Sequence, residues 1–441
     1  MEAGTPPRPL RRGKYGTIPD MDKLTRREMI ANTAMAAGAV AAGQLAAGCD
    51  AGFVKNEQML YRPLGRTGLE VSVIGFGAEW MERNTQETCT AVTRRCEERG
   101  VNIVDCWMSN PDVRTKLGNA LAPHRRRWII QGHVGATWKD GQYERTRDLP
   151  RCREAFADLL TRLRTDYVDI GMIHYVDTPQ EWDSIVKGPF LGYMRELRAQ
   201  GKIRHIGLST HNPLVGIAAV KSGVIEVLMF SVNPAYDILP PIEEFMSYYK
   251  GDERYDAKLG GIAPERAELY RLCEERGVGL TVMKAYAGGR LFDAAQSPFR
   301  VALTPVQCVH YALTRPGAAT VLAGYDTVEH VDAAARYCTA TAAERDYASV
   351  LAKAPRHAYD GQCTYCGHCA PCTSGIDIAM VNKLYDLAAA QPSVPDSVRK
   401  HYLALKHHAG ECTACRRCEG RCPFHVKVAE RMKAAAALFG A

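Results

Sequence analysis

Short runs of apolar and β-branched residues alternate with amphipathic stretches through the middle of the chain. The stretches between the runs, such as residues 86–99, 151–163 and 264–276, repeat their apolar positions at helical spacing. Such alternation is typical of a parallel sheet whose strands are connected by helices. Eight runs can be counted, at residues 71–77, 101–106, 128–134, 167–175, 203–209, 227–232, 279–284 and 320–324.

Eight strand–helix units within residues 60–340 predict a (β/α)8 barrel. A doubly wound nucleotide-binding sheet is the main alternative, but no G-x-G-x-x-G follows the first run. The long, aromatic and charged stretch 240–261 predicts a loop at the top of the barrel, after the sixth strand. The remaining residues, 341–441, read as a linker followed by a small second domain, with a helix over 384–408 that is interrupted near its prolines.

This second domain contains two runs of four closely spaced cysteines. The second run reads C-x2-C-x2-C-x3-C-P, the pattern of bacterial ferredoxins. In proteins with two clusters the fourth cysteine of such a run binds the other cluster, so we predict a ferredoxin-like domain with two crossed [4Fe-4S] clusters. A pair of structural zinc sites is the alternative, because C-x2-C pairs also bind zinc. The predicted sets are Cys363, Cys366, Cys369 and Cys422 for one cluster, and Cys412, Cys415, Cys418 and Cys372 for the other.

Composition adds little to this picture and excludes one class of partner. A chain of 441 residues with 46% hydrophobic and 24% charged residues is ordinary for a soluble protein of two or three domains. The formal net charge of +7 is modest and lies partly in the first thirty residues, so we expect no nucleic-acid partner. Most cysteines outside the two runs are expected to be small buried side chains.

The first 49 residues predict an export signal. Arg26 and Arg27 stand ahead of an Ala- and Gly-rich stretch, which resembles a twin-arginine signal and is too weakly apolar for a membrane anchor. Residues 45–49 resemble a lipoprotein cleavage box, with Cys49 as the lipidated residue. An ordinary signal-peptidase site or an unprocessed arm is the alternative. We therefore expect a periplasmic protein, or one on the outer face of the cytoplasmic membrane and anchored to it through Cys49.

Barrel enzymes gather their reacting groups at the carboxyl ends of the strands. There the sequence places Asp105 after the second run, His133 after the third and His174 after the fourth. Histidines on successive strand ends beside a carboxylate suit acid–base chemistry near neutral pH, so these three are the predicted catalytic residues. With His211 after the fifth run, the same histidines could instead hold a divalent metal ion.

Several motifs together resemble the aldo/keto reductases. The resemblance covers residues 60–340, and the cysteine-rich tail makes it similar to the branch of that family fused to a ferredoxin-like domain with two clusters. It implies a barrel that binds a nicotinamide nucleotide at its top and reduces carbonyls with an Asp, Tyr, Lys and His tetrad. The motifs are L-G-R-T-G-L at 64–69, G-V-N-I-V-D at 100–105, D-Y-V-D at 166–169, I-H at 173–174 and I-G-L-S at 206–209.

The sequence departs from that tetrad at two positions. Asp105 and His174 match the aspartate and the histidine, but Asn110 stands where the family has its tyrosine and His133 where it has its lysine. An amide has no proton with a tunable pKa. Tyr175, another loop tyrosine or one of the histidines must therefore supply the acid.

The resemblance also implies the residues that would bind a nucleotide. Lys284 lies in a stretch similar to the loop after the seventh strand near the pyrophosphate, where it would neutralise charge. Asp326 stands where the family often has a basic residue for the 2′-phosphate, which disfavours NADPH. The predicted cofactor-binding residues are Ser209, Asn233, Lys284 and Gly324.

Three functions are compatible with these patterns. The first is an iron–sulfur oxidoreductase in which two [4Fe-4S] clusters, and NAD(P)H if the nucleotide is retained, exchange electrons with a small carbonyl or hydroxyl substrate at the barrel top. The second is a metal-dependent lyase, isomerase or hydrolase that uses the histidines, with structural clusters. The third is an electron-transfer subunit with an inactive barrel. A redox protein or a membrane electron donor is the expected partner of the first.

Overall fold

The computed structural model describes residues 55–243, 261–355, 359–389, 391 and 393–440. The described residues all belong to one compact unit, which begins at Val54. The predicted export signal and Cys49 lie outside the described residues, as does most of the predicted loop at 240–261.

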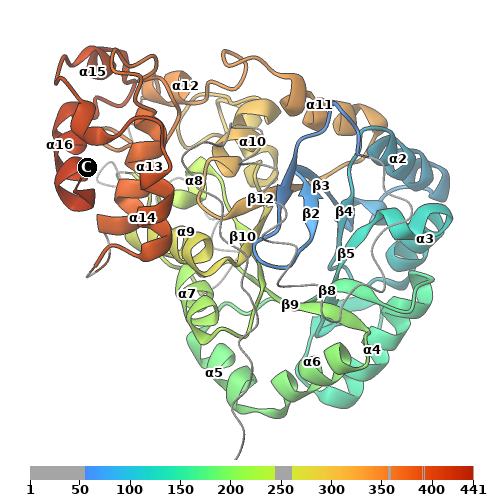
Figure 1. Cartoon of the computed structure of the whole chain (residues 1–441). Coiled ribbons are helices and arrows are strands. Elements are labelled where there is room, and N and C mark those ends of the chain that lie inside the picture. The colour runs from blue at the N-terminus through green and yellow to red at the C-terminus, as the bar shows by residue number, and fades with distance from the viewer. Residues whose placement is uncertain (1–54, 244–260, 356–358, 390, 392, 441) are drawn as a thin grey trace, which may run out of the picture. The chain divides into compact units, whose positions relative to one another are not determined.

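Eight parallel strands form a closed barrel at the centre of this unit (Figure 1). They coincide with the eight apolar runs, so the predicted (β/α)8 barrel is confirmed. Around the barrel the strands follow one another in chain order, which places the carboxyl ends of neighbouring strands side by side. The strands are β3 (Ile74–Gly77), β4 (Ile103–Cys106), β5 (Ile129–Val134), β8 (Val168–Ile173), β9 (Ile203–Thr210), β10 (Val227–Ser231), β11 (Gly279–Met283) and β12 (Ala318–Gly324).

Helices surround the barrel, and most begin with a proline in the first turn, where its missing N–H costs no hydrogen bond. The helices predicted at 86–99, 151–163 and 264–276 are confirmed as α2, α4 and α9. The ring consists of α2 (Gln86–Glu98), α3 (Pro111–Leu121), α4 (Leu149–Arg162), α5 (Pro179–Lys187), α6 (Pro189–Ala199), α7 (Pro213–Ser222), α8 (Pro234–Asp237), α9 (Pro264–Arg276), α10 (Pro305–Leu313) and α11 (Val328–Thr339).

A short hairpin, β1 (Tyr61–Pro63) and β2 (Glu70–Ser72), precedes the barrel. Leu64, in its turn, is fully buried and belongs to the same apolar cluster as Ile170, Met172 and Val227 of the barrel strands. A Cβ at Gly279, the first residue of β11, would come within 2.6 Å of the Leu64 side chain. Glycine at the start of β11 therefore makes room for the residue that plugs the amino-terminal end of the barrel.

The tail beyond α11 is helical in its described part and packs beside α9 and α10 (Figure 1). The interrupted helix predicted at 384–408 appears as two helices, which span residues 378–389 and 396–403 and are separated around the prolines. No strand is present in the tail residues that the structure describes, so its ferredoxin-like fold rests on the cysteine spacing. The tail helices are α12 (Ala348–Ala352), α13 (Ile378–Ala389), α14 (Asp396–Leu403), α15 (Arg417–Arg421) and α16 (Val428–Phe439).

Buried polar side chains join the tail to the barrel. Asp237, at the end of α8, is fully buried and accepts hydrogen bonds from the hydroxyls of Tyr270 at 2.5 Å and Tyr311 at 2.8 Å, and from Arg266. The Tyr311 hydroxyl also contacts that of Tyr359 at 2.9 Å, and Tyr359 donates to a backbone carbonyl at the start of α8. We call this set of residues the Asp237 network.

His310 predicts how stability depends on pH. Burial, together with the nearby Arg345, Arg315 and Arg62, lowers its pKa to about 4, and Asp346 only partly opposes this. In the unfolded chain His310 binds a proton near pH 6.5, whereas in the folded chain it stays neutral down to about pH 4. Its contribution to the free energy of unfolding is therefore fully present above pH 6.5 and is lost as the pH falls below that value. We expect His310 alone to account for about 2 kcal/mol of lost unfolding free energy between pH 7 and pH 5.

Urea unfolding of the wild type and of His310→Gln at both pH values measures this contribution, because the difference removes every other titrating group. Equal losses in the two proteins would show that His310 does not resist protonation.

No helix among the described residues is both long and apolar enough to span a membrane.

Candidate functional site

Three predicted catalytic residues meet at the carboxyl end of the barrel. Asp105 and His133 lie near the ends of β4 and β5, and His174 follows β8, the next strand around the barrel. His133 Nε2 lies 2.9 Å from Asp105 Oδ1, and His133 Nδ1 lies 2.8 Å from His174 Nδ1. All three side chains are at most 4% exposed. Gln131, two residues before His133, also donates to Asp105 Oδ1, at 2.9 Å.

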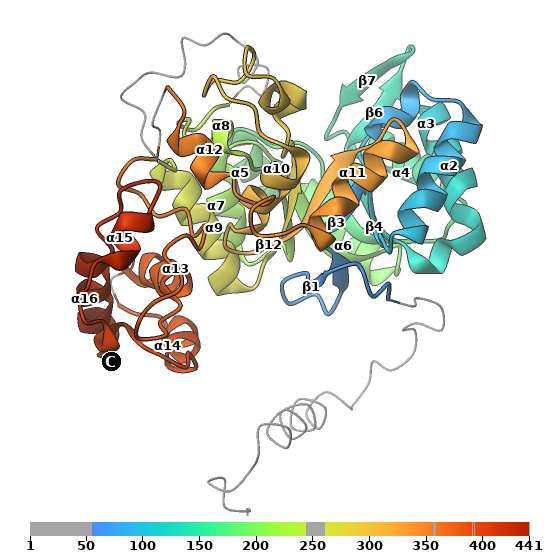
Figure 2. The same cartoon turned by 90° about the horizontal axis from the view of Figure 1, so that it is seen from above.

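The fourth member of this group comes from a hairpin that the sequence analysis did not predict. β6 (Ala136–Lys139) and β7 (Gln142–Arg145) pair antiparallel between β5 and α4, and Figure 2 shows them projecting beside α3 and α4. Asp140 and Gly141 form its two-residue turn, both with positive φ. Asp-Gly between alternating polar and apolar residues is a strong hairpin signal, and it was available in the sequence.

Tyr143, on β7, places its hydroxyl 2.6 Å from His174 Nε2. Its ring packs edge-on against Trp107, which itself stacks on the His174 ring with 5.9 Å between centroids. Burial raises the pKa of Tyr143 to about 12, so the hydroxyl keeps its proton across the physiological range. The sequence indicates this residue only as another loop tyrosine, beside Tyr175.

Two arginines hold the hairpin against the histidine strand. The Arg145 guanidinium donates to the carbonyl of Tyr175 at 2.7 Å, and the Arg147 guanidinium donates to the carbonyls of His174 and Tyr175. Both arginines also pair with Glu181, on α5. The side chain and the backbone of His174 are therefore both fixed relative to β7.

The four side chains form one continuous hydrogen-bonded chain, Tyr143–His174–His133–Asp105, which we call the proton relay. Burial, with His133 beside it, holds the pKa of His174 well below its ordinary value, so this ring is neutral near pH 7. Asp105 Oδ2 is buried and has no hydrogen-bond partner among the described residues. The Nε2 of His133 thus faces the Asp105 carboxylate inside the barrel.

Asn110, at the family's tyrosine position, has a structural role instead. It is the N-cap of α3, where its side-chain oxygen accepts from the N–H of Asp112 at 2.9 Å, and its amide donates to Glu82. Asn is among the best N-cap residues, because its oxygen satisfies an N–H that the helix leaves open. Asn110 therefore caps a helix at the position where the family has its tyrosine, and the tyrosine near His174 is Tyr143, from the hairpin after β5.

The four predicted cofactor-binding residues lie at the ends of β9, β10, β11 and β12, on the opposite half of the rim. The hydroxyl of Ser209 accepts the N–H of Tyr175 at 2.8 Å. The amide of Asn233 donates to the carbonyl of Lys284 and accepts from the N–H of Tyr236. Both side chains thus support the local backbone.

Lys284 and Gly324 differ in what they could offer a ligand. Burial lowers the pKa of Lys284, while the charges of Glu79 and Asp177 oppose that shift. Over Gly324 lies the indole of Trp80, so close that a Cβ there would be 1.7 Å from its Nε1. The guanidinium of Arg83 stacks on the same indole at 4.1 Å. A nucleotide at the end of β12 would have to displace this pair.

The histidines do not form the alternative metal site. His211 pairs with Asp177 at 2.9 Å, and the ring nitrogens of His133 and His174 all have partners within the proton relay. Among the residues that the structure describes, no three His, Cys, Asp or Glu side chains are arranged to hold one metal ion.

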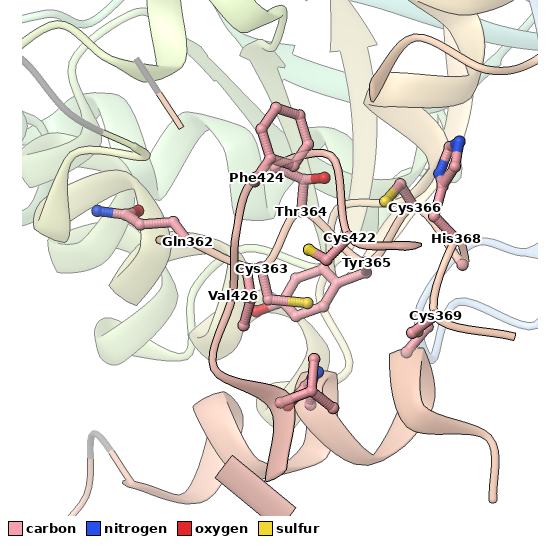
Figure 3. A pocket seen from close by; sticks show the side chains of 14 residues that line it. Gln362, Cys363, Thr364, Tyr365, Cys366, His368, Cys369, Cys422, Phe424 and Val426 are labelled. Carbon is pink, nitrogen blue, oxygen red and sulfur yellow. The ribbon is translucent and has the colours of Figure 1, made fainter. Parts of the chain in front are cut away.

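Four of the tail cysteines line one small cavity, with a volume of about 20 Å³. Figure 3 shows Cys363, Cys366 and Cys369 of the first run and Cys422 of the second around this space. Phe424, Val426 and Val428 provide apolar walls. These are the four cysteines that the crossed pairing assigns to one cluster.

The second predicted set is closer to the surface. Cys415 is exposed, whereas Cys418 is buried, and Cys412 and Cys372 are half-buried. The hydroxyl of Thr373, next in the chain to Cys372, lies 3.5 Å from the Cys415 sulfur. Arg421 donates to the carbonyls of Cys369 and Pro371 at 2.7 Å, so the two runs are joined directly.

Comparison with known sequences identifies relatives of the barrel. The sequence model of the Aldo/keto reductase family matches residues 73–305, just over half of the chain. An uncharacterized oxidoreductase of Bacillus subtilis is 28% identical over 196 residues, which are 42% of this chain and 61% of that protein. An NADH-specific methylglyoxal reductase of Escherichia coli is 28% identical over 159 residues, 33% of this chain and 48% of that protein. The chain spans less than two thirds of the length of these curated relatives.

The barrel is also similar to solved structures. An aldo-keto reductase from Bacillus halodurans, in its holo form, is 25% identical, with a TM-score of 0.51. The similarity covers 68% of this chain and 99% of that one. Both cysteine runs come after the part of the chain that the family model matches.

Proposed function

Because this chain belongs to the aldo/keto reductase family, we propose that it is an oxidoreductase that interconverts a small carbonyl compound and its alcohol at the carboxyl end of the barrel. The observation that carries this proposal is the proton relay, which ends in a tyrosine hydroxyl at the rim. Reduction of a carbonyl needs a proton at its oxygen, and a positioned hydroxyl with a proton reservoir behind it supplies one.

In the state ready for reduction, the relay holds one extra proton on His133. His133 is then an imidazolium that donates to Asp105 through Nε2 and to His174 through Nδ1. His174 is neutral and donates from Nε2 to the Tyr143 oxygen, which leaves the hydroxyl proton free to point at a substrate oxygen. These protonation states are assigned from the pattern of hydrogen bonds.

Tyr143 gives its proton to the substrate oxygen as the carbon is reduced. The tyrosine oxygen then recovers a proton from His174 Nε2, and His174 Nδ1 takes the one on His133 Nδ1. His133 ends as a neutral ring that donates to Asp105. The relay thus delivers one proton without leaving a tyrosinate, whose formation the raised pKa of Tyr143 would oppose. Oxidation of the alcohol would run the same transfers in reverse.

We further propose that the tail holds two [4Fe-4S] clusters, one in the cavity of Cys363, Cys366, Cys369 and Cys422 and one bound by Cys412, Cys415, Cys418 and Cys372. The support for clusters over zinc ions is the spacing of the two runs of four cysteines, the second of which is followed by proline. Bound clusters would supply single electrons to the site. Reduction of a carbonyl to an alcohol takes two electrons and two protons. Two clusters could hold one electron each, the relay supplies the proton that goes to oxygen, and solvent supplies the proton that goes to carbon.

A nicotinamide nucleotide, which the family usually uses, would supply hydride instead. The rim fits it poorly at the end of β12, because Trp80 covers Gly324 and the acidic Asp326 follows. We therefore assign no step to a nucleotide and let experiment decide whether one binds.

We propose that the protein works outside the cytoplasm, after twin-arginine export, either free in the periplasm or anchored at Cys49 to the membrane surface. Transport of folded proteins by this route is consistent with a chain whose clusters are inserted before export. Its electron donor would then be a redox protein or a membrane component.

The test is an anaerobic titration of the purified full-length protein. We expect about eight iron atoms per chain and bleaching of the visible absorbance by dithionite, with EPR signals of reduced clusters. Methylglyoxal, the substrate in the name of one relative, is a suitable first carbonyl for reoxidation of the reduced protein. Absence of iron would overturn the cluster proposal. Bleaching by NADH or NADPH would bring the nucleotide into the reaction.

A further inference from the structure

The surface around Cys415 is basic. Between residues 406 and 427 the sequence contains five Lys or Arg and two Glu. Both glutamates are already engaged: Glu411 accepts from the backbone N–H of His408 and pairs with His407, and Glu419 accepts the N–H of Ala429. The two negative charges leave this segment with a net charge of +3, with histidines counted as neutral.

Arg416 and Arg417 are the centre of this surface. Both are exposed and directly follow the exposed Cys415. Neither guanidinium has a hydrogen bond or an ion pair with any described residue, whereas Arg421 is tied to two carbonyls and Lys427 lies 4.0 Å from Glu430. We call Cys415, Arg416 and Arg417 the Cys415 face.

We propose that the Cys415 face is the docking surface for an acidic one-electron carrier protein, an inference that rests on the proposed clusters. Cys415 is the most solvent-exposed of the eight cysteines, so an electron has its shortest path to the surface there. One electron leaves the reduced carrier and enters the tail, and no proton needs to move with it. The proposed proton relay lies on different elements, in the barrel.

A small basic surface is sufficient for such a partner. Complexes of electron carriers are typically small and short-lived, and complementary charge mainly accelerates their encounter. Arg416 and Arg417 would attract an acidic carrier to the surface next to Cys415, where the electron enters the tail. The same charges also predict a strong dependence on salt, because exposed ionic interactions are screened.

The experiment measures binding of the anaerobic, cluster-loaded full-length chain to two purified carriers of opposite charge, an acidic flavodoxin and a basic cytochrome c. By biolayer interferometry at about 20 mM salt, we expect flavodoxin to bind and cytochrome c not to bind, and about tenfold weaker flavodoxin binding at 200 mM salt. Arg416→Glu/Arg417→Glu should weaken flavodoxin binding at least about tenfold, and the double Gln variant less.

Arg126 and Arg164 give a matched control. They are exposed on the barrel without a described side-chain partner, so Arg126→Glu/Arg164→Glu changes the net charge equally and should leave binding nearly unchanged. The visible spectrum of each variant reports that its clusters are intact. Equal loss in both double variants would overturn the proposal, as would preference for cytochrome c.

A third probe separates the remaining explanation. Vesicles of phosphatidylglycerol test whether the Cys415 face binds a membrane surface instead. If the wild type binds these vesicles, the Arg416→Glu/Arg417→Glu variant does not, and flavodoxin binds neither protein, the Cys415 face is a membrane contact and the proposal is overturned. If iron and the EPR signals are absent, the proposed clusters fail. If they are present and flavodoxin does not bind, the docking inference alone fails.

Discussion

Replacing Tyr143 by Phe is expected to lower the rate of carbonyl reduction by about 10²- to 10⁴-fold, the usual contribution of a positioned acid. The variant removes one oxygen and keeps the ring, which packs against Trp107. Binding of the substrate should therefore change less than turnover. The measurement is steady-state reduction of methylglyoxal, or of another carbonyl that the enzyme accepts, with dithionite-reduced viologen as electron source.

Tyr175→Phe is the matched control, because Tyr175 was the other tyrosine that the sequence offered as a replacement acid. Its ring packs edge-on against His211, and the proton relay does not include it. We expect this variant to keep most of the activity. Full activity in Tyr143→Phe, or a larger loss in Tyr175→Phe, would show that the relay does not deliver the proton.

Cys422→Ala is expected to remove one complete cluster, lowering iron from about eight to about four atoms per chain. Cys422 shares a cavity with three cysteines of the first run, although more than fifty residues separate it from Cys369. Loss of its thiolate should therefore abolish the cluster of the first run and spare the other. Iron analysis and EPR spin counting of the purified variant measure this directly.

Two double variants test the crossing itself. If the pairing is crossed, Cys363→Ala/Cys422→Ala still retains about four iron atoms, and Cys412→Ala/Cys422→Ala retains none. Uncrossed pairing gives the reverse result. Cys338→Ser, in the half-buried cysteine of α11 outside both runs, should keep full iron and controls for the loss of a thiol.

The barrel could be predicted because its strands are buried on both faces. All six residues of β8, including Asp169, are buried, and such short apolar runs separated by helical stretches have few other interpretations. The strand ends then follow directly, which is why Asp105, His133 and His174 were placed together. Their predicted proximity depended only on the order of the strands.

The tyrosine of the relay was missed for a different reason. Tyr143 lies 31 residues before His174 and reaches it only because Asp140 and Gly141 fold the segment into a hairpin. The hairpin signal predicts a turn but not the direction in which the turn projects. Contacts with Glu181 and the carbonyls after β8, which set that direction, are tertiary and have no local pattern.

The role of the predicted cofactor-binding residues stays a prediction. Ser209 and Asn233 occupy the expected strand ends, yet their polar atoms bind the backbone of neighbouring loops. The position of a residue along a barrel strand predicts where its Cα atom lies, at the rim or in the core. Which partner it meets is decided by the loops, the least predictable part of this fold.

The Asp237 network also bears on how precisely the tail is held. An apolar contact tolerates sliding, since one methyl group replaces another at little cost, whereas hydrogen bonds from Tyr270, Tyr311 and Arg266 to one buried carboxylate are satisfied in a single arrangement. Any shift of the tail that moved Tyr359 would strand buried hydroxyls without water. The Asp237 network therefore fixes the distance between the cysteine loops and the barrel. The rate of electron tunnelling from the proposed clusters to the barrel would depend most strongly on this distance.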